Sequence, residues 1–472
     1  MRIISKVNQF SINNCILQRL FIVLLFLPLS KNVSGQSVII DGISYNIYGE
    51  FCSVYKGNNG IGGNIVIPPT IDWLRKTYPV KEVSSSAFLN CKDLISIVLP
   101  EGVTEIGEKA FSGCTNLISV SLPSSLKYIE TKSFYECSSL NSINIPESVK
   151  SIGNYAFNGC KKLKRITIPS SVTTIGDYAF QDCNELIAVK ISGVVNSLGS
   201  GVFQCCTSLT DIKLPQELKT IGPYCFSGCT NLQNIELPQQ LETIGSRAFN
   251  DCQNLKSIMI PNSVTDIGVN CLSGCSALEE VSIPFVGTES NPNSPTPNTL
   301  FGKIFSDTSR PNHTKVEQRL WVATNTYCDV VSYIPSGLSK VVVTGNCNLY
   351  FAFRNCTTIK EVELSGDLTT IGNSSFENCT NLERVSLSNT IDSIGFKAFY
   401  GCKNLNSITI PQSVGSIEGR VFQGCSALSN IIIPESVNSI GFYAFNGCKK
   451  LKRITIPSSV TTIGDYAFAS CI

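Results

Sequence analysis

A spacing of 23 residues between cysteines organises most of this 472-residue chain. Fifteen of the 22 cysteines stand at this interval, in two runs separated by a longer segment. A period of about 20 to 50 residues is typical of a solenoid, in which each repeat forms one coil that stacks on the next. A single compact core is therefore not expected. The in-phase cysteines are Cys91, Cys114, Cys137, Cys160, Cys183, Cys206, Cys229, Cys252, Cys275, Cys356, Cys379, Cys402, Cys425, Cys448 and Cys471.

Two further residue types keep the same phase as the cysteines. Phenylalanine stands three positions before each in-phase cysteine, with Leu272 as the one departure. Leucine or isoleucine stands three positions after it and opens the pattern L-x-x-[IV]-x-[ILV], as in Leu163, Ile166 and Ile168. A period of about 20 to 29 residues with this leucine spacing lies in the leucine-rich repeat range. The sequence thus predicts a leucine-rich repeat solenoid.

The residues of one unit indicate how a coil buries its apolar side chains. Successive side chains of a strand point to opposite faces, so the leucine and isoleucine positions predict an inward face. Stacked coils would then form a parallel sheet on the concave side, which makes the fold class α/β but strand-dominated, with short strands, turns or helical turns on the convex side. We expect a continuous interior ladder in which the thiols are mostly unpaired and buried, represented by Phe111, Cys114, Phe157, Cys160, Phe180, Cys183, Phe445 and Cys448.

The unit L-x-x-I-x-[IL]-P-x-S-V-x-x-I-G-x-x-A-F-x-G-C resembles the BspA-like leucine-rich repeat, a class of bacterial and protist surface proteins with a 23-residue repeat. The resemblance covers about residues 65 to 472, and the segment from Val38 to Tyr45 resembles the strand-rich cap that precedes such repeats. It implies a surface-exposed recognition or adhesion protein that binds host or microbial macromolecules. Because one scaffold serves many functions, the binding surface has to be argued from the residues displayed.

The start of the chain has the composition of a secretory signal peptide. Arg2, Lys6 and Arg19 occur without an acidic residue, and the run from Leu20 to Leu29 is apolar apart from one proline. A membrane-spanning helix needs about 20 apolar residues, so we expect cleavage before Gln36, no membrane span afterwards, and a secreted or cell-surface location. The expected divisions are a signal peptide at 1–35, a strand-rich cap at 36–64, repeats at 65–284, an insertion at 285–337, and repeats at 338–472 that end without a cap.

The insertion at 285–337 lengthens one repeat, so that 60 residues separate the strand openings at Leu278 and Leu338. Long insertions in repeat proteins usually lie on one face and are often functional. Two alternatives stand evenly: a ligand-binding loop, or a self-packed excursion whose aromatic side chains form a small satellite core. We expect it to carry more ligand binding than the concave strands, because it concentrates aromatic residues. Its candidate binding residues are Phe301, Phe305, Trp321, Tyr327 and Tyr333.

The outward positions of the concave strands predict a mixed-charge surface without an aromatic residue. Protein hot spots favour Trp, Tyr and Arg, so a solvated face is at least as good an interpretation as a binding face. Lys164 and Arg165, neighbours on one strand, are the candidate binding residues there. On the other side of the coils, tyrosines recur two positions before phenylalanine, where they either shield the core or present a row for contact: Tyr155, Tyr178, Tyr224, Tyr443 and Tyr466.

Residues that carry chemistry are scarce. The single histidine, His313, counts against histidine-based catalysis and against multi-histidine metal sites. A pair of His313 and Cys328 is formally a nucleophile arrangement, but no third orienting group is identifiable. With 37 Lys+Arg and 35 Asp+Glu, the chain offers no bulk charge to attract nucleic acid or an anionic membrane. We therefore expect no enzyme activity, catalytic residue, metal site, cofactor or nucleic-acid partner.

Two function classes remain. The favoured one is a secreted or cell-surface recognition or adhesion protein that binds a host or microbial protein or glycan through the solenoid and its insertion. The alternative is a structural or self-associating surface component without a separate ligand. Repeats that stop at Ile472 without a polar cap expose a strand edge, so self-association through the C-terminal end is a further expectation.

Overall fold

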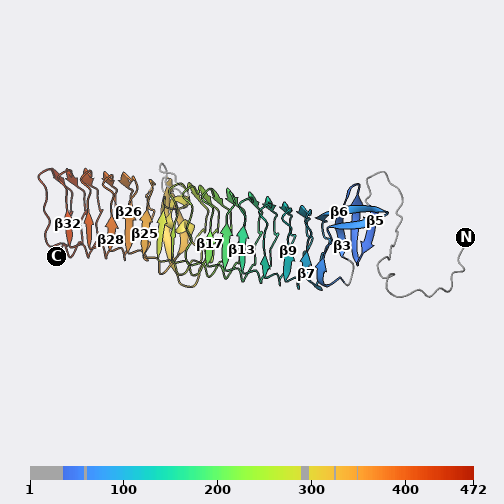
Figure 1. Ribbon diagram of the computed structural model, residues 1–472. Helices are drawn as coiled ribbons and strands as arrows, with labels where there is room; N and C mark the ends of the chain where they lie inside the picture. Colours follow the sequence, from blue (N-terminus) through green and yellow to red (C-terminus); the bar gives the residue numbers. More distant parts are fainter. Residues whose placement is uncertain (1–35, 58–60, 289–296, 324–325, 348, 472) are drawn as a thin grey trace, which may run out of the picture.

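The computed structural model describes residues 36–57, 61–288, 297–323, 326–347 and 349–471, with the backbone alone described between 319 and 329. These residues form a long stack of coils, with the strand-rich N-terminal part at one end and the insertion part-way along (Figure 1). The solenoid prediction is confirmed. The signal peptide expected at 1–35 lies outside the described residues.

The strands predicted from the leucine pattern run along one side of the stack in parallel, and we call them the first ladder. Neighbours pair one repeat apart, as Ser119 does with Ser142, because each coil places the same position at the same height. Burial alternates along each strand, so that in Arg165–Ile168 the isoleucines are buried and Arg165 is exposed. The strands are β4 (Gly63–Val66), β7 (Leu94–Val98), β9 (Ser119–Ser121), β11 (Ser142–Ile143), β13 (Arg165–Ile168), β15 (Ala188–Ile191), β17 (Asp211–Lys213), β20 (Ser257–Met259), β22 (Glu280–Ile283), β25 (Lys340–Val343), β26 (Glu361–Leu364), β28 (Arg384–Ser386), β30 (Ser407–Thr409) and β32 (Asn430–Ile432).

A second parallel ladder is built from two-residue strands that precede the recurring glycine of the repeat. That glycine is required by close backbone approach: a Cβ on Gly153 would lie 2.5 Å from the backbone nitrogen of Thr131 in the preceding coil. The strands are β8 (Glu105–Ile106), β10 (Tyr128–Ile129), β12 (Ser151–Ile152), β14 (Thr174–Ile175), β16 (Ser197–Leu198), β18 (Thr220–Ile221), β19 (Thr243–Ile244), β21 (Asp266–Ile267), β27 (Thr370–Ile371), β29 (Ser393–Ile394), β31 (Ser416–Ile417), β33 (Ser439–Ile440) and β34 (Thr462–Ile463).

The remainder of each coil is a run of turns that carries the A-F-x-G-C residues, and we call it the turn segment. The strand-dominated class is confirmed. The helical turns that the sequence allowed on the convex side are not found, since the described residues contain no α-helix. The two short 3-10 helices, η2 (Pro297–Thr299) and η3 (Phe301–Ile304), belong to the insertion.

The interior ladder of phenylalanine and cysteine is present as predicted. Phe157 is fully buried and stacks 5.2 Å, between ring centroids, from both Phe134 and Phe180. Most in-phase thiols donate a hydrogen bond to a phenylalanine carbonyl of the preceding coil, as Cys183 Sγ does to Phe157 O at 3.3 Å. Among the residues whose side chains are described, every cysteine is unpaired, and all but Cys91, Cys205 and Cys471 are buried.

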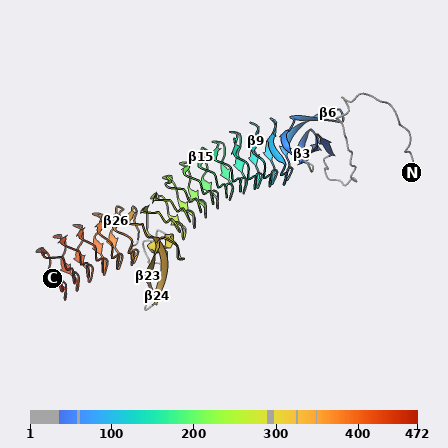
Figure 2. The ribbon, with the colours of Figure 1, turned by 90° about the horizontal axis from the view of Figure 1, so that it is seen from below.

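In the described chain, strands of six residues or more occur only outside the regular repeats. At the N-terminal end, β1 (Gln36–Ile40), β2 (Ile43–Tyr48) and β3 (Phe51–Gly57) form an antiparallel meander. It joins the stack through β6 (Lys76–Val83), which also pairs with β5 (Thr70–Trp73). The insertion contains a hairpin of β23 (His313–Ala323) and β24 (Thr326–Pro335), which projects from the rod (Figure 2). The first ladder continues past it, because β22 pairs directly with β25.

Candidate binding site

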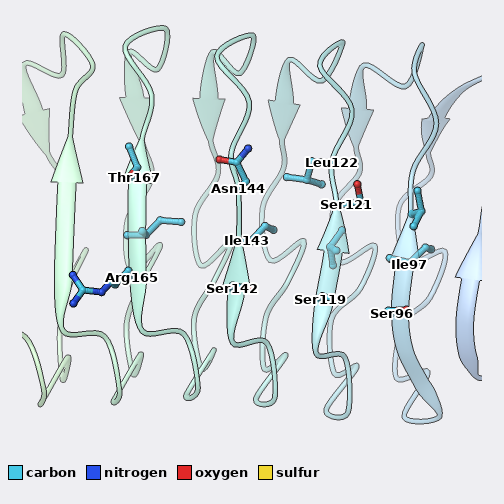
Figure 3. A pocket seen from close by; sticks show the side chains of 13 residues that line it. Ser96, Ile97, Ser119, Ser121, Leu122, Ser142, Ile143, Asn144, Arg165 and Thr167 are labelled. Carbon is cyan, nitrogen blue, oxygen red and sulfur yellow. The ribbon is translucent and has the colours of Figure 1, made fainter.

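An open groove of about 550 Å³ lies on the first ladder across β7, β9, β11 and β13, and we call it the first-ladder groove. Its floor is formed by the outward side chains of four neighbouring coils, which Figure 3 shows side by side. The outward side chains are small in the middle of the groove, which leaves the space between coils open. They are Ser96, Val98, Ser119, Ser121, Ser142, Asn144, Arg165 and Thr167.

The N-terminal flank of the groove is apolar. Val66 is 70% exposed on β4, and Ile95, Val98 and Ile118 are each more than 40% exposed on or beside β7 and β9. A partner that covers these exposed aliphatic side chains gains free energy, because apolar surface is removed from water. Sequence reasoning missed this patch because it looked for aromatic residues; the signal was the aliphatic residues at outward strand positions, where other coils carry polar ones.

The opposite end of the groove is basic. Arg165 is one of the lining residues, and its side chain extends away from the serines at the end of the groove (Figure 3). Lys164, the other candidate beside this strand, is exposed but does not line the groove. Within the described part of the chain, Arg165 has no ion pair, and the hydroxyls of Ser119 and Ser121 have no hydrogen-bond partner. The groove therefore offers unused donors between an apolar flank and a single cation.

The insertion does not use its aromatic residues as predicted. Phe301 and Phe305 are fully buried, so the prediction that they contact a ligand is wrong. Phe301 lies 4.9 Å from Phe353, between ring centroids, and thus supplies the rung that the interior ladder needs between Leu272 and Phe353. Leu272 N donates to Ile304 O as it would to the next coil. The satellite-core alternative is wrong as well for these residues, because they join the main core.

Polar contacts, of which those of Gln318 are buried, fix the base of the hairpin to the coils. Gln318 is 1% exposed; its Oε1 accepts from Gly302 N at 3.1 Å, and its Nε2 donates to Ala352 O at 2.9 Å. Arg310 pairs with Asp251, and Asn355 Nδ2 donates to Glu317 O at 2.5 Å. Asp251, Ala352 and Asn355 lie in turn segments, so the hairpin is anchored on that side of the coils. It projects from the stack well apart from β9 and β15 (Figure 2).

The other predicted residues of the insertion are spread along this hairpin. Tyr333 is half-buried near the base, where its backbone nitrogen donates to Ser306 O at 2.7 Å. Trp321 and Tyr327 lie outside the residues whose side chains the structure describes. His313 is paired with Pro335 at the base, whereas Cys328 is paired with Leu320 seven rungs away, so about 23 Å of strand separates them and a Cys–His pair is not formed.

The repeats can be assigned to a family. Six copies of the BspA type leucine rich repeat region match residues 81–209, 196–292 and 350–472. The chain belongs to the BspA-type leucine-rich repeat family. The matched ranges contain all the in-phase cysteines, and the resemblance stated from the sequence is confirmed.

Solved structures of several bacterial repeat proteins are similar to this BspA-type chain. A leucine-rich repeat protein from Bacteroides ovatus is 31% identical, with 90% of this chain and 99% of that one covered and a TM-score of 0.54. A leucine rich cell surface protein from Faecalibacterium prausnitzii is 26% identical, covers 91% of this chain and 95% of its own, and has a TM-score of 0.36. A comparison with curated proteins found no match.

Membrane-spanning helices and metal-binding clusters are both absent from the described residues. No helix there is long and apolar enough to cross a membrane. In the same part of the chain, no group of three or more His, Cys, Asp or Glu side chains could hold a metal ion.

Proposed function

We propose that this BspA-type protein is exported and acts in recognition or adhesion, binding an extended segment of a partner protein in the first-ladder groove. The observation that carries the proposal is the groove itself, which opens across four coils between exposed aliphatic residues and the unpaired Arg165. A matching segment would place aliphatic side chains against Val98 and Ile118 and an acidic group beside Arg165. Buried aliphatic area supplies affinity, and the charge fixes the direction of the segment.

A protein segment suits this groove better than a glycan. Sugar rings are commonly held on an aromatic platform, and the side chains that line the groove include no aromatic residue. The unused hydroxyls of Ser119 and Ser121 can hydrogen-bond to the backbone of an extended chain, which alternates donors and acceptors. The first experiment is selection from a random peptide library against the full chain, with enrichment of aliphatic and acidic residues as the expected result. Enrichment of neither residue type would overturn the proposal.

Filling the groove should abolish this binding. Ser119 is exposed at the start of β9, so a Ser119→Trp side chain would occupy the groove without entering the core. We expect the dissociation constant of the selected peptides to rise by about tenfold or more. Ser407→Trp is the matched control, because Ser407 is the equally exposed first residue of β30, outside the groove. An equal loss for both variants would contradict the assignment of the site, and titration calorimetry measures it.

The projecting hairpin supplies a second contact in this proposal. Trp321 and Tyr327 are directly paired in its register, toward the end away from the coils. We expect Trp321→Ala with Tyr327→Ala to reduce adhesion of protein-coated beads to cultured host cells more than Lys164→Ala with Arg165→Ala does, because truncated aromatic contacts usually cost more than exposed charges. A larger loss of adhesion for Lys164→Ala with Arg165→Ala would contradict the role of the hairpin as the stronger contact.

A further inference from the structure

One position of every turn segment has its backbone in the left-handed region, and in every coil but one the residue there is not glycine. The residue two positions before the interior phenylalanine has a positive φ, with values of 60° for Arg420 and 56° for Tyr443. Left-handed backbone disfavours side chains other than those of Gly, Asn and Asp. Yet most members are Tyr, Lys, Arg or Phe, and none is acidic: Ser86, Lys109, Lys132, Tyr155, Tyr178, Gly201, Tyr224, Arg247, Asn270, Phe351, Ser374, Lys397, Arg420, Tyr443 and Tyr466.

A second position of the same turn segments provides an internal comparison. The residue directly before the in-phase cysteine also has a positive φ, but there Gly, Asn and Asp predominate, as in Gly159, Asp182 and Asn378. The same backbone demand is thus met by the usual residues at one position and by large cationic or aromatic ones at the other. Since strained backbone tends to accompany functional positions, the side chains of the first position call for a role of their own.

The same order of two cations followed by two tyrosines occurs twice at the strained position. Lys109, Lys132, Tyr155 and Tyr178 occupy four successive coils, and Lys397, Arg420, Tyr443 and Tyr466 occupy four others. Each second cation lies over the following tyrosine, at 5.3 Å from the ring centroid for Lys132 on Tyr155 and for Arg420 on Tyr443. The tyrosines of each pair stack, at 5.0 Å and 5.1 Å.

Within the described residues, the C-terminal set is the one in which neither cation has an ion pair. In the N-terminal set Lys109 pairs with Glu108 at 2.7 Å, whereas the residue in the place of Glu108 is Phe396 in the C-terminal set. Within the described residues neither Lys397 nor Arg420 has an ion pair, and Arg420 Nε is buried without a hydrogen-bond partner. The surrounding region is basic too: residues 395–472 contain Lys397, Lys403, Arg420, Lys449, Lys450, Lys452 and Arg453 against Glu418, Glu435 and Asp465.

We propose that Lys397, Arg420, Tyr443 and Tyr466, which we call the C-terminal row, bind a linear acidic polysaccharide that lies along the stack. Coils repeat at the strand spacing of about 4.8 Å, so the row offers one donor group per coil in a straight line. Its cations and tyrosine hydroxyls complement the carboxylate or sulfate groups and hydroxyl oxygens of such a chain. This site lies on the turn segments, apart from the first-ladder groove.

Backbone hydrogen bonding favours a polysaccharide over an acidic protein segment. The backbone N–H groups of Arg420 and Tyr443 already donate to Phe442 O and Asp465 O of the next coil, both at 2.9 Å. At Arg420 and Tyr443 the row therefore presents side-chain donors and no free backbone edge with which a peptide could pair. A polysaccharide needs no such edge, because its groups along the row are mainly acceptors.

The test compares two variants of equal charge change in the full chain. Lys397→Gln with Arg420→Gln removes the two cations of the row, and Lys452→Gln with Arg453→Gln removes two exposed cations near the first ladder of the last coil. We expect the first pair to raise the dissociation constant for heparin, or for alginate, by about tenfold or more and the second pair to change it by less than about threefold. Circular dichroism at increasing temperature confirms that both variants stay folded.

Named outcomes decide the proposal. Equal losses in the two variants would show attraction by net charge alone and would overturn it. Stronger binding of poly-glutamate than of either polysaccharide would assign the row to an acidic protein segment instead. Neutral dextran should give the same binding signal with every variant as with the original chain, because the row recognises charged groups. Tyr443→Phe with Tyr466→Phe should weaken heparin binding while the two rings remain stacked. If this variant binds heparin as tightly as the original chain, the tyrosine hydroxyls are not part of the site. The peptides selected by the first-ladder groove should bind all these variants normally.

Discussion

Replacing Phe157 with alanine is expected to lower the free energy of unfolding by about 3–5 kcal/mol. The ring is fully buried and is held between Phe134 and Phe180, both at 5.2 Å between ring centroids. Its neighbours cannot move into the cavity, because each of them stacks on a further ring of the ladder. The lost contacts and the retained cavity therefore both contribute to the loss.

Tyr155→Ala is the matched control for this prediction. Tyr155 belongs to the same turn segment and also stacks, on Tyr178, but it is half-buried. We expect a loss of about 1 kcal/mol. Denaturant unfolding measures both variants, and hydrogen exchange should show the Phe157→Ala effect concentrated in the adjacent coils, since a solenoid is stabilised by nearest neighbours. A loss below about 1 kcal/mol for Phe157→Ala would contradict the role of the ladder.

The repeating part of the fold could be predicted from the sequence because each coil makes the same contacts with its neighbours. The position of Cys114 or Phe180 in one unit fixes its environment in the stack, so periodicity alone indicates burial. The insertion has no such periodicity. Whether its aromatic residues are buried depends on whether the neighbouring coils leave a gap in the interior ladder. The missing rung after Leu272 was a usable signal that an insertion residue had to fill the interior, and Phe301 does so.

The candidate site was less predictable for a different reason. The outward positions of the first ladder were identified correctly, and Arg165 does lie in the groove. A groove, however, is a property of several coils together, and it arises where small side chains such as Ser119 and Ser142 stand next to one another. The cations of the C-terminal row were likewise visible in the sequence, but the strained backbone that distinguishes their position was not.

The largest pH effect should appear on the alkaline side. Burial raises the pKa of the Cys271 thiol from its ordinary value of 9.0 to about 12, and burial raises the pKa of Cys114 to about 12 as well. Below pH 9 the folded and unfolded chains both keep these protons, so the stability contribution is complete. Above it the unfolded chain releases them while the folded chain does not. Each such thiol then lowers the free energy of unfolding by about 1.4 kcal/mol per pH unit, until the pH reaches the pKa of the thiol in the folded chain.

Because many in-phase thiols act together, we expect the chain to unfold within about one to two pH units above 9, in the presence of a reductant. Cys225→Ala with Cys271→Ala tests the cause, since equivalent positions of other coils carry Ala156 and Ala248 and the packing is compatible with alanine. At pH 7 the free energy of unfolding of this variant should lie within about 2 kcal/mol of that of the original chain. Above pH 9 its free energy of unfolding should fall by about 3 kcal/mol less per pH unit than that of the original chain. Thermal unfolding between pH 7 and 10.5 measures both. Parallel curves for the two chains would show that another group, and not the buried thiol, governs the alkaline loss.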